Sequence, residues 1–204
     1  MNAMTERGIG RYRYAVAAVA CFVAAPAAAH SGTGLAGGFV SGFAHPLSGG
    51  DHLLAMICVG VWGAFLGRPL IYVLPVVFPL MMVVGAIAGM VSTASPPVEI
   101  AIALSVLSLG ACIGFAWRAP IWAAMLIVAG FAVFHGFAHG RELPSAADPV
   151  GYSLGFVFAT GALHVLGIGL GELGSRMGQT RMLRIAGVAI AMAGLVYLYR
   201  AIGA

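Results

Sequence analysis

Two short stretches of an otherwise apolar chain combine histidine with carboxylate side chains. They are residues 45–52, HPLSGGDH, and residues 134–142, FHGFAHGRE. Ionisable groups beside hydrocarbon are costly unless they are paired, hydrated or ligated, so they indicate a functional site with a partner. Neutral imidazoles and carboxylates suit divalent nickel, cobalt, zinc or copper. We therefore predict one site for a divalent transition-metal ion, with the ligands His45, Asp51, His52, His135, His139 and Glu142.

Helical geometry supports the second stretch as a ligand set. At about 100° per residue, His135, His139 and Glu142 fall within an arc of about 60° if the helix runs through all three. The glycines that follow the two histidines lie on the adjoining face, where the backbone of a neighbouring helix can approach closely. For Glu142 an alternative stays open, because this carboxylate could instead pair with Arg141 or with solvent.

Two further histidines are weaker metal candidates. His164 lies deeper in an apolar segment with Thr160 one turn before it, and the alternative is a hydrogen-bonded packing residue. His30 becomes the first residue if a leader is cleaved after Ala29, and a free amine beside an imidazole can capture a metal. A single terminal histidine is more often incidental.

The composition indicates an all-α, multi-pass membrane protein. Of the 204 residues, 61% are hydrophobic and 8% are charged, whereas an ordinary soluble domain carries about 25% charged residues. The net charge of +4 comes from arginines that lie mostly between apolar segments, which suits control of topology better than nucleic-acid binding. Three cysteines without CxxC spacing predict neither a disulfide framework nor a thiolate cluster.

The N-terminal residues 1–29 have the pattern of a secretory signal peptide. Three arginines precede an apolar run from Tyr14 to Ala25, and three alanines then offer a small-residue cleavage site. The alternative is an uncleaved first transmembrane helix. With cleavage, residues 30–204 form a single transmembrane domain whose N-terminus lies outside the cytoplasmic membrane.

The first apolar segment after the leader must be broken. A straight helix over residues 35–67 would be about 50 Å long, whereas the hydrocarbon core is about 30 Å thick. Pro46 disfavours helical geometry at His45, residues 48–50 (Ser-Gly-Gly) offer a joint, and Asp51 is placed to cap the next helix. We expect residues 35–44 to be interfacial or re-entrant, and residues 51–67 to form most of the first span.

Five further spans bring the predicted total to six. Pro75 and Pro79 are expected to bend the second span, and Asp148 is expected to cap the fifth. A GFAH tetrapeptide recurs at residues 42–45 and 136–139; it hints at an inverted three-plus-three repeat, although four residues can recur by chance. Spans two to six are predicted at residues 70–91, 98–117, 121–140, 150–173 and 182–202.

The arginines orient these spans. With six spans and an external N-terminus, the loops place five arginines inside and two outside, as the positive-inside rule requires. At about 1.5 Å per residue, His52 lies about 25 Å and His135 about 26 Å above the cytoplasmic ends of their helices. Both stretches therefore reach the outer membrane boundary together. The inner arginines are Arg68, Arg118, Arg176, Arg181 and Arg184; the outer ones are Arg141 and Arg200.

The two stretches also carry a family resemblance. Residues 45–52 fit H-x5-D-H and residues 134–142 fit F-H-G-x-A-H-G-x-E, and both resemble the signatures of the HupE/UreJ family, membrane accessory proteins of nickel hydrogenases and ureases. The signal peptide, the six-span layout and the lengths between motifs match as well, without a departure inside either motif. The resemblance implies that the six candidate ligands named above occupy the family's functional positions.

The resemblance further implies nickel uptake across the inner membrane for hydrogenase or urease maturation proteins. Imidazole and carboxylate chemistry alone suits Co²⁺ or Zn²⁺ equally. The chain has no GxxxxGK[ST] loop, so we expect uptake without ATP. With nickel as the transported ion, we also expect no prosthetic group and no enzymatic activity. Two alternatives stay open: a membrane-embedded zinc hydrolase in which Asp51 or Ser48 assists a bound water, and a sensor or insertion partner that binds metal without transporting it.

Overall fold

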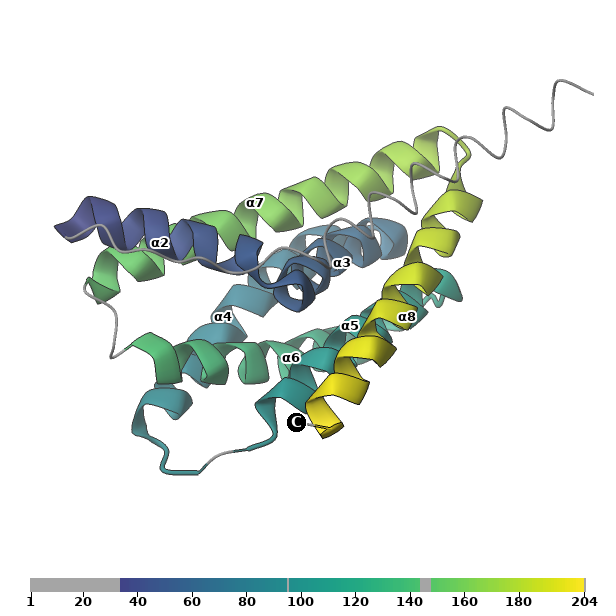
Figure 1. Ribbon diagram of the computed structural model, residues 1–204. Helices are drawn as coiled ribbons and strands as arrows, with labels where there is room; N and C mark the ends of the chain where they lie inside the picture. Colours follow the sequence, from purple (N-terminus) through teal and green to yellow (C-terminus); the bar gives the residue numbers. More distant parts are fainter. Residues whose placement is uncertain (1–33, 95, 144–147, 204) are drawn as a thin grey trace, which may run out of the picture.

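The computed structural model describes residues 34–94, 96–143 and 148–203, and all regular elements in these ranges are helices (Figure 1). The expected signal peptide and His30 lie outside the described residues. The helices are α2 (Gly34–Ser48), α3 (Gly50–Leu66), α4 (Leu70–Val91), α5 (Val98–Gly114), α6 (Ile121–Glu142), α7 (Pro149–Arg176) and α8 (Thr180–Gly203).

The chain is a multi-pass membrane protein by the length and hydropathy of its helices. Among the described residues, four helices are long and apolar enough to cross a bilayer: α4, α6, α7 and α8. The bent pair α2 and α3 qualifies as a fifth span when its two helices are taken together. Helix α5 is apolar but has 17 residues, about 25 Å at 1.5 Å per residue, a little less than the hydrocarbon core. Each predicted span from the second to the sixth corresponds to one helix.

The predicted break in the first segment is confirmed, and its details differ from the prediction. Helices α2 and α3 meet at Gly49 with a bend of 82°. Helix α2 continues through His45 and Pro46 to Ser48, whose hydroxyl donates a hydrogen bond to the His45 carbonyl at 2.7 Å. The prediction that Pro46 would end the helix at His45 was therefore wrong. A proline disfavours but does not forbid helix at the preceding residue, and packing of α2 against α7 outweighs this local preference.

Asp51 was predicted to cap α3, and this prediction was wrong. The N-cap position is Gly49, so Asp51 lies inside the first turn. Its carboxylate instead accepts hydrogen bonds from the backbone N–H of His52 at 2.7 Å and from the His52 ring. A carboxylate in the first turn is still favoured by the helix dipole.

Glycines allow both halves of the broken segment to approach α7 closely. A Cβ at Gly42 of α2 would collide with the Tyr152 carbonyl of α7, and one at Gly60 of α3 would collide with the His164 carbonyl. Along the chain, Gly42 comes before Gly60, and their contacts Tyr152 and His164 follow in the same order on α7. The broken segment and α7 therefore run in the same direction (Figure 1). The broken segment therefore packs along a single helix, α7, and its joint at Gly49 lies between the two contact regions.

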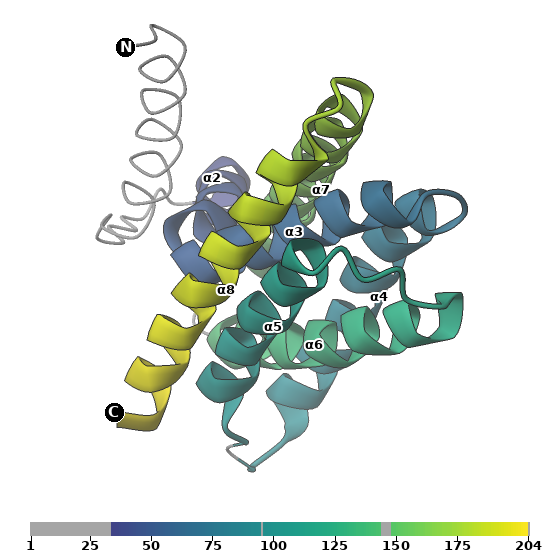
Figure 2. The same ribbon diagram turned by 90° about the vertical axis from the view of Figure 1, so that its right-hand side faces the viewer.

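The remaining helices form two further close pairs. Helices α4 and α6 run parallel, since Met82 meets Gly136 and Ala86 meets Gly140. Helices α5 and α8 lie side by side and run antiparallel, with Gly110 against Gly187 (Figure 2). If α2 and α3 count as one span, this first span pairs with the fifth (α7), and the fourth (α6) pairs with the second (α4) in the same parallel sense. The third span (α5) and the sixth (α8) pair with each other. This arrangement is typical of inverted repeats in transporters.

The predicted cap of α7 is confirmed and gives a simple stability test. The Asp148 carboxylate accepts hydrogen bonds from the backbone N–H groups of Val150 and Gly151, both at 3.2 Å. Asp148→Ala is expected to lower the free energy of unfolding by about 1 kcal/mol, because these N–H groups lose their acceptor. Thermal unfolding in detergent measures the loss. Asp148→Asn keeps a capping oxygen and should retain most of the stability; an equal loss in both variants would contradict the cap.

Candidate metal site

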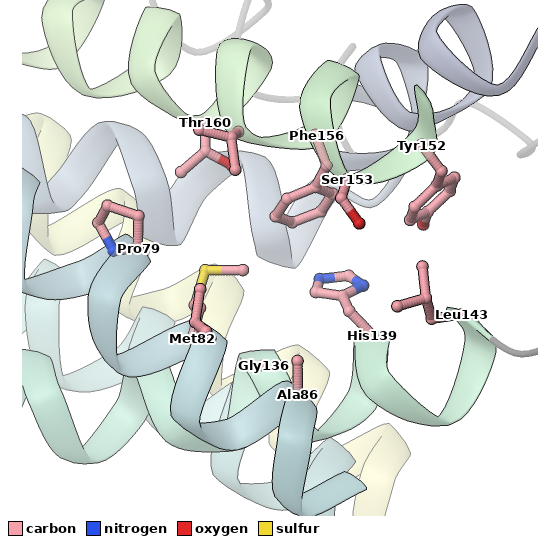
Figure 3. A pocket seen from close by; sticks show the side chains of 12 residues that line it. Pro79, Met82, Ala86, Gly136, His139, Leu143, Tyr152, Ser153, Phe156 and Thr160 are labelled. Carbon is pink, nitrogen blue, oxygen red and sulfur yellow. The ribbon is translucent and has the colours of Figure 1, made fainter. Parts of the chain in front are cut away.

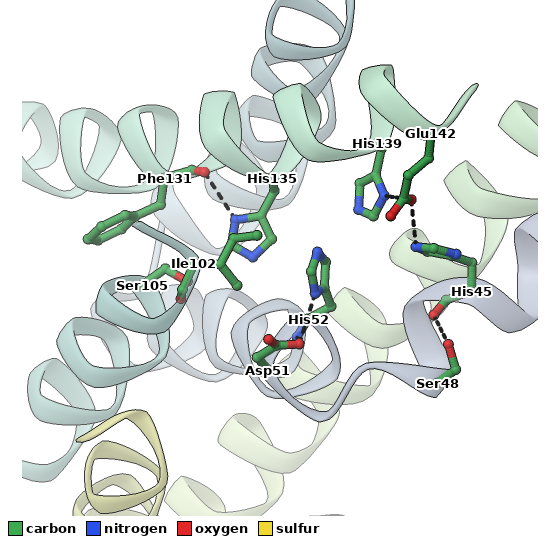
Figure 4. A network of polar contacts seen from close by, with 10 residues as sticks. All are labelled: His45, Ser48, Asp51, His52, Ile102, Ser105, Phe131, His135, His139 and Glu142. Atoms are coloured by element: carbon green, nitrogen blue, oxygen red, sulfur yellow. Dashed lines mark hydrogen bonds and ion pairs between the residues drawn. The ribbon is translucent and has the colours of Figure 1, made fainter. Parts of the chain in front are cut away.

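The two histidine-rich stretches meet in space, and all six predicted ligands lie in one region (Figure 4). His45 is in the last turn of α2, and Asp51 and His52 are in the first turn of α3, on either side of the joint. His135 and His139 are in the last two turns of α6. The joint at Gly49 is what allows residues from α2 and α3 to face the same end of α6.

Four imidazoles form a continuous row in this region. His45 contacts His139, His139 contacts His52, and His52 contacts His135, and the ring centroids are 4.9 Å apart at each step. We call these four residues the imidazole row. Since the rings come from α2, α6, α3 and α6 in that order, the row is a tertiary feature that crosses between the two stretches.

The row leads from the surface into the protein interior. The side chain of Glu142, beside its first members, is 54% exposed, and that of His45 is 30% exposed. The value is 8% at His139 and 15% at His52, and His135 is completely buried. The row therefore connects an exposed end at Glu142 and His45 with a completely buried end at His135.

The exposed end of the row holds a compact set of ligand atoms. The Glu142 Oε2 atom lies 3.3 Å from His45 Nε2 and 3.5 Å from His139 Nδ1. One ligand atom from each residue lies within 4.8 Å of the other two. Since metal–nitrogen bonds are about 2.1 Å long, ligands on opposite sides of an ion are about 4.2 Å apart, so a small contraction would close this group around one ion. Nearby, the Arg141 guanidinium donates to the Ser92 carbonyl at 2.8 Å.

At the buried end, hydrogen bonds orient two imidazoles as metal ligands. The His52 Nδ1 atom lies 2.9 Å from the Asp51 carboxylate, and the His135 Nδ1 atom lies 3.0 Å from the Phe131 carbonyl. Because both partners only accept, each Nδ1 carries the proton and each Nε2 keeps a free lone pair. Neither Nε2 has a hydrogen-bond partner within the part of the chain that the structure describes. Such second partners orient the histidine ligands of metal sites.

Aromatic side chains that sequence reasoning did not identify enclose the row. Phe156 of α7 lies 4.4 Å from His139 between ring centroids, and Tyr152 lies 5.6 Å from His45. The Tyr152 hydroxyl is buried without a hydrogen-bond partner among the described residues. On the α4 side, Phe78 contacts His135 at 5.4 Å. Only the one-turn spacing of Tyr152 and Phe156 on α7 was visible in the sequence, and such spacing is common in apolar helices.

A small apolar cavity borders the row between α4, α6 and α7 (Figure 3). It has a volume of about 100 Å³. His139 and Phe156 line one part of it, and Pro79, Met82 and Thr160 line another. His164, the weaker candidate, lies one turn beyond Thr160 on α7 and is not in direct ring contact with the row.

The donor set fits a divalent transition-metal ion. Imidazole nitrogens with free lone pairs at Nε2 are available at the buried end, and a carboxylate joins two imidazoles at the exposed end. Asp51 and Glu142 together supply two negative charges, which is the number that balances one divalent ion. The same atoms arranged in a row, rather than in one closed shell, permit an ion to exchange ligands step by step.

Comparison with known proteins agrees with the resemblance in the two stretches. The chain matches the family model described as HupE / UreJ protein over residues 17–197. It is 42% identical over 177 residues to Protein HupE of Rhizobium leguminosarum bv. viciae, an alignment that covers 86% of this chain and 93% of that protein. No solved structure matches the chain. Since the family match includes the whole imidazole row and all helices except the last turns of α8, the chain belongs to the HupE/UreJ family.

Proposed function

We propose that this chain takes up Ni²⁺ across the cytoplasmic membrane without ATP, and that the imidazole row is the start of the path. The observation that carries the proposal is the fall in exposure along the row, from Glu142 and His45 at the surface to the completely buried His135. A resident metal cofactor needs one closed set of ligands, whereas cargo needs a series of ligand sets that it can leave. The family membership supports nickel and a role in the maturation of hydrogenase or urease.

The proposal includes the orientation of the chain. Six spans are formed by the pair α2 and α3 and by α4 to α8, with the mature N-terminus in the periplasm. The imidazole row then opens to the periplasm, and the arginine-rich loops face the cytoplasm, in agreement with the positive-inside rule. An inward-moving divalent ion gains about 4.6 kcal/mol per 100 mV of inside-negative potential, twice the value for a single charge. That gain can drive uptake without ATP.

The ligands have different roles in this proposal. Glu142, His45 and His139 exchange with the waters of the incoming ion at the exposed end, and the glutamate balances part of its charge. His52 and His135 then accept the ion through Nε2. Asp51 holds the His52 ring by its Nδ1 proton and contributes the second negative charge from outside the row. The same ligands can also bind cobalt or zinc, so the selectivity for nickel is inferred mainly from the family membership.

A membrane-embedded zinc hydrolase is the second candidate, because an apolar cavity does touch His139. Its volume of about 100 Å³ is well below the roughly 300–1,000 Å³ of typical small-molecule pockets. The cavity also borders only one member of the row, whereas a hydrolytic site would place substrate beside a metal held by several. The row therefore favours a permease over an enzyme.

Uptake of radioactive nickel into lipid vesicles containing the purified chain tests this function. With an inside-negative potential, nickel is expected to accumulate at least about 10-fold faster than in protein-free vesicles, because the potential favours inward movement of the charge. Collapsing the potential should reduce accumulation. A metal sensor or a hydrolase would bind nickel to the protein but leave the vesicle interior empty of it, and this result would contradict the proposal.

A further inference from the structure

One buried histidine lies beyond the imidazole row. His164 is in the middle of α7 and is 1% exposed. Neither of its ring nitrogens makes a hydrogen bond of regular geometry in the described ranges of the chain. A buried polar group without a partner costs free energy, and an apolar side chain of similar size at the same place would avoid that cost. The Pro75 carbonyl of α4 lies against the ring, as the packing interpretation predicts, but a single carbonyl can engage only one of the two ring nitrogens.

A single aromatic ring separates His164 from the row. The Phe78 ring centroid lies 5.4 Å from that of His135 and 5.4 Å from that of His164, with interplanar angles of 65° and 86°. Phe78 belongs to α4 and is completely buried. The order of contacts is therefore His52, His135, Phe78 and His164, so Phe78 links the row to a buried imidazole in the middle of α7.

Two oxygen atoms near His164 complete a set of neutral donors. Thr160, one turn earlier on α7, has a buried hydroxyl without a hydrogen-bond partner among the residues described, and it lines the cavity that His139 also borders. On the α4 side, His164 faces the backbone carbonyl of Pro75. Pro79 has no N–H to bond this carbonyl in the regular helical pattern.

We propose that His164, with the Thr160 hydroxyl and the Pro75 carbonyl, forms an inner station that the nickel ion occupies after it leaves the imidazole row and passes Phe78. The inference rests on the proposed uptake function. The station has one nitrogen and two neutral oxygens and no carboxylate, so it holds the ion more weakly than the outer ligands do. Weak binding suits an inner station, because an ion held tightly there would not be released to the cytoplasm.

His164→Leu tests the inner station in the vesicle uptake assay. The maximal uptake rate is expected to fall at least about 10-fold, because the ion loses its nitrogen ligand between the row and the cytoplasm. The nickel concentration for half-maximal rate, and nickel binding by the detergent-solubilised protein, should change less than about twofold, because the outer ligands remain. Thermal stability should stay equal or rise, since the leucine removes an unsatisfied polar group.

Two further variants separate ligation from packing. His164→Gln keeps a polar group of similar size and should reduce the maximal rate by a smaller factor, because an amide oxygen is a weaker ligand for nickel than imidazole. The matched control is Leu163→Met, a volume-conserving change at the adjacent buried position, which should leave uptake unchanged.

The outcomes distinguish the inner station from the transport function itself. A wild-type rate in His164→Leu, with transport by the wild type intact, would overturn the station alone. Loss of nickel binding or of thermal stability in both His164 variants would show that His164 maintains the fold and would also overturn the station. Absence of nickel uptake by the wild-type protein would overturn the permease proposal together with its inner station.

Discussion

His139→Ala is expected to abolish nickel uptake and to weaken nickel binding by about 100-fold or more, because the ion loses a direct imidazole ligand at the exposed end of the row. His139 is the centre of the exposed half of the row: its ring contacts both His45 and His52, and its Nδ1 faces Glu142. Its removal breaks the exposed ligand group and also the step from that group to His52. Titration calorimetry on the purified protein measures the binding, and the vesicle assay measures the uptake.

The fold should survive this change. The polar contact of the His139 ring is its Nδ1 atom at 3.5 Å from the half-exposed Glu142 carboxylate, so truncation removes packing and one long contact, and the loss of stability should stay near or below about 2 kcal/mol. Ser105→Ala is the control for removing a buried polar group, since Ser105 is buried in α5 and its hydroxyl donates to the Ile102 carbonyl of the same helix. Nickel binding that persists at wild-type strength in His139→Ala would refute the row as the metal path.

Gly136→Ala should strongly destabilise the helix bundle. A Cβ at Gly136 would collide with the Met82 carbonyl of α4, and a backbone atom cannot move aside as the end of a side chain can. The two helices would have to separate, which we expect to cost about 3 kcal/mol or more and to displace His135 and His139 from the row. Unfolding of the purified protein in detergent measures the stability.

Gly130→Ala is the matched control on the same helix. No atom lies within 4 Å of a Cβ at Gly130 among the described residues, and alanine favours helix over glycine by up to about 1 kcal/mol. This variant should be as stable as the wild type or more so, and its nickel uptake should be unchanged. Equal behaviour of Gly130→Ala and Gly136→Ala would mean that the close approach of α4 and α6 does not hold the site together.

The helices of the bundle contribute unequally to the imidazole row and to the side chains around it. Helices α2, α3 and α6 supply the imidazole row, and α4 and α7 supply Phe78, Phe156 and His164 around it. The segment of α2 and α3 packs against α7 as α6 packs against α4, yet among the described residues only the first of these segments is broken, at Gly49. That break adds Asp51 and His52 to a site that would otherwise hold the ligands of α2 and α6 alone.

Sequence alone predicted most of the helices and the chemistry of the site. Apolar runs between Pro, Gly and charged residues placed α4 at its observed bounds and most ends of the other helices within a few residues. The Asp148 cap, the joint at residues 48–50, and the shared face of His135 and His139 were equally predictable. These features depend on hydropathy, on backbone geometry and on the 3.6-residue period, which all act over one or two turns.

The tertiary structure decided what the local pattern could not. The order of the four imidazoles, the turn of the Asp51 carboxylate toward the His52 ring, and the helical path through Pro46 all follow from how α2 and α3 pack against α6 and α7. Phe78 entered the site only because α4 lies between α6 and α7. The physical reason is that side chains from different helices meet at distances set by backbone approach at glycines, and this approach depends on the partner helix as much as on the chain's own local sequence.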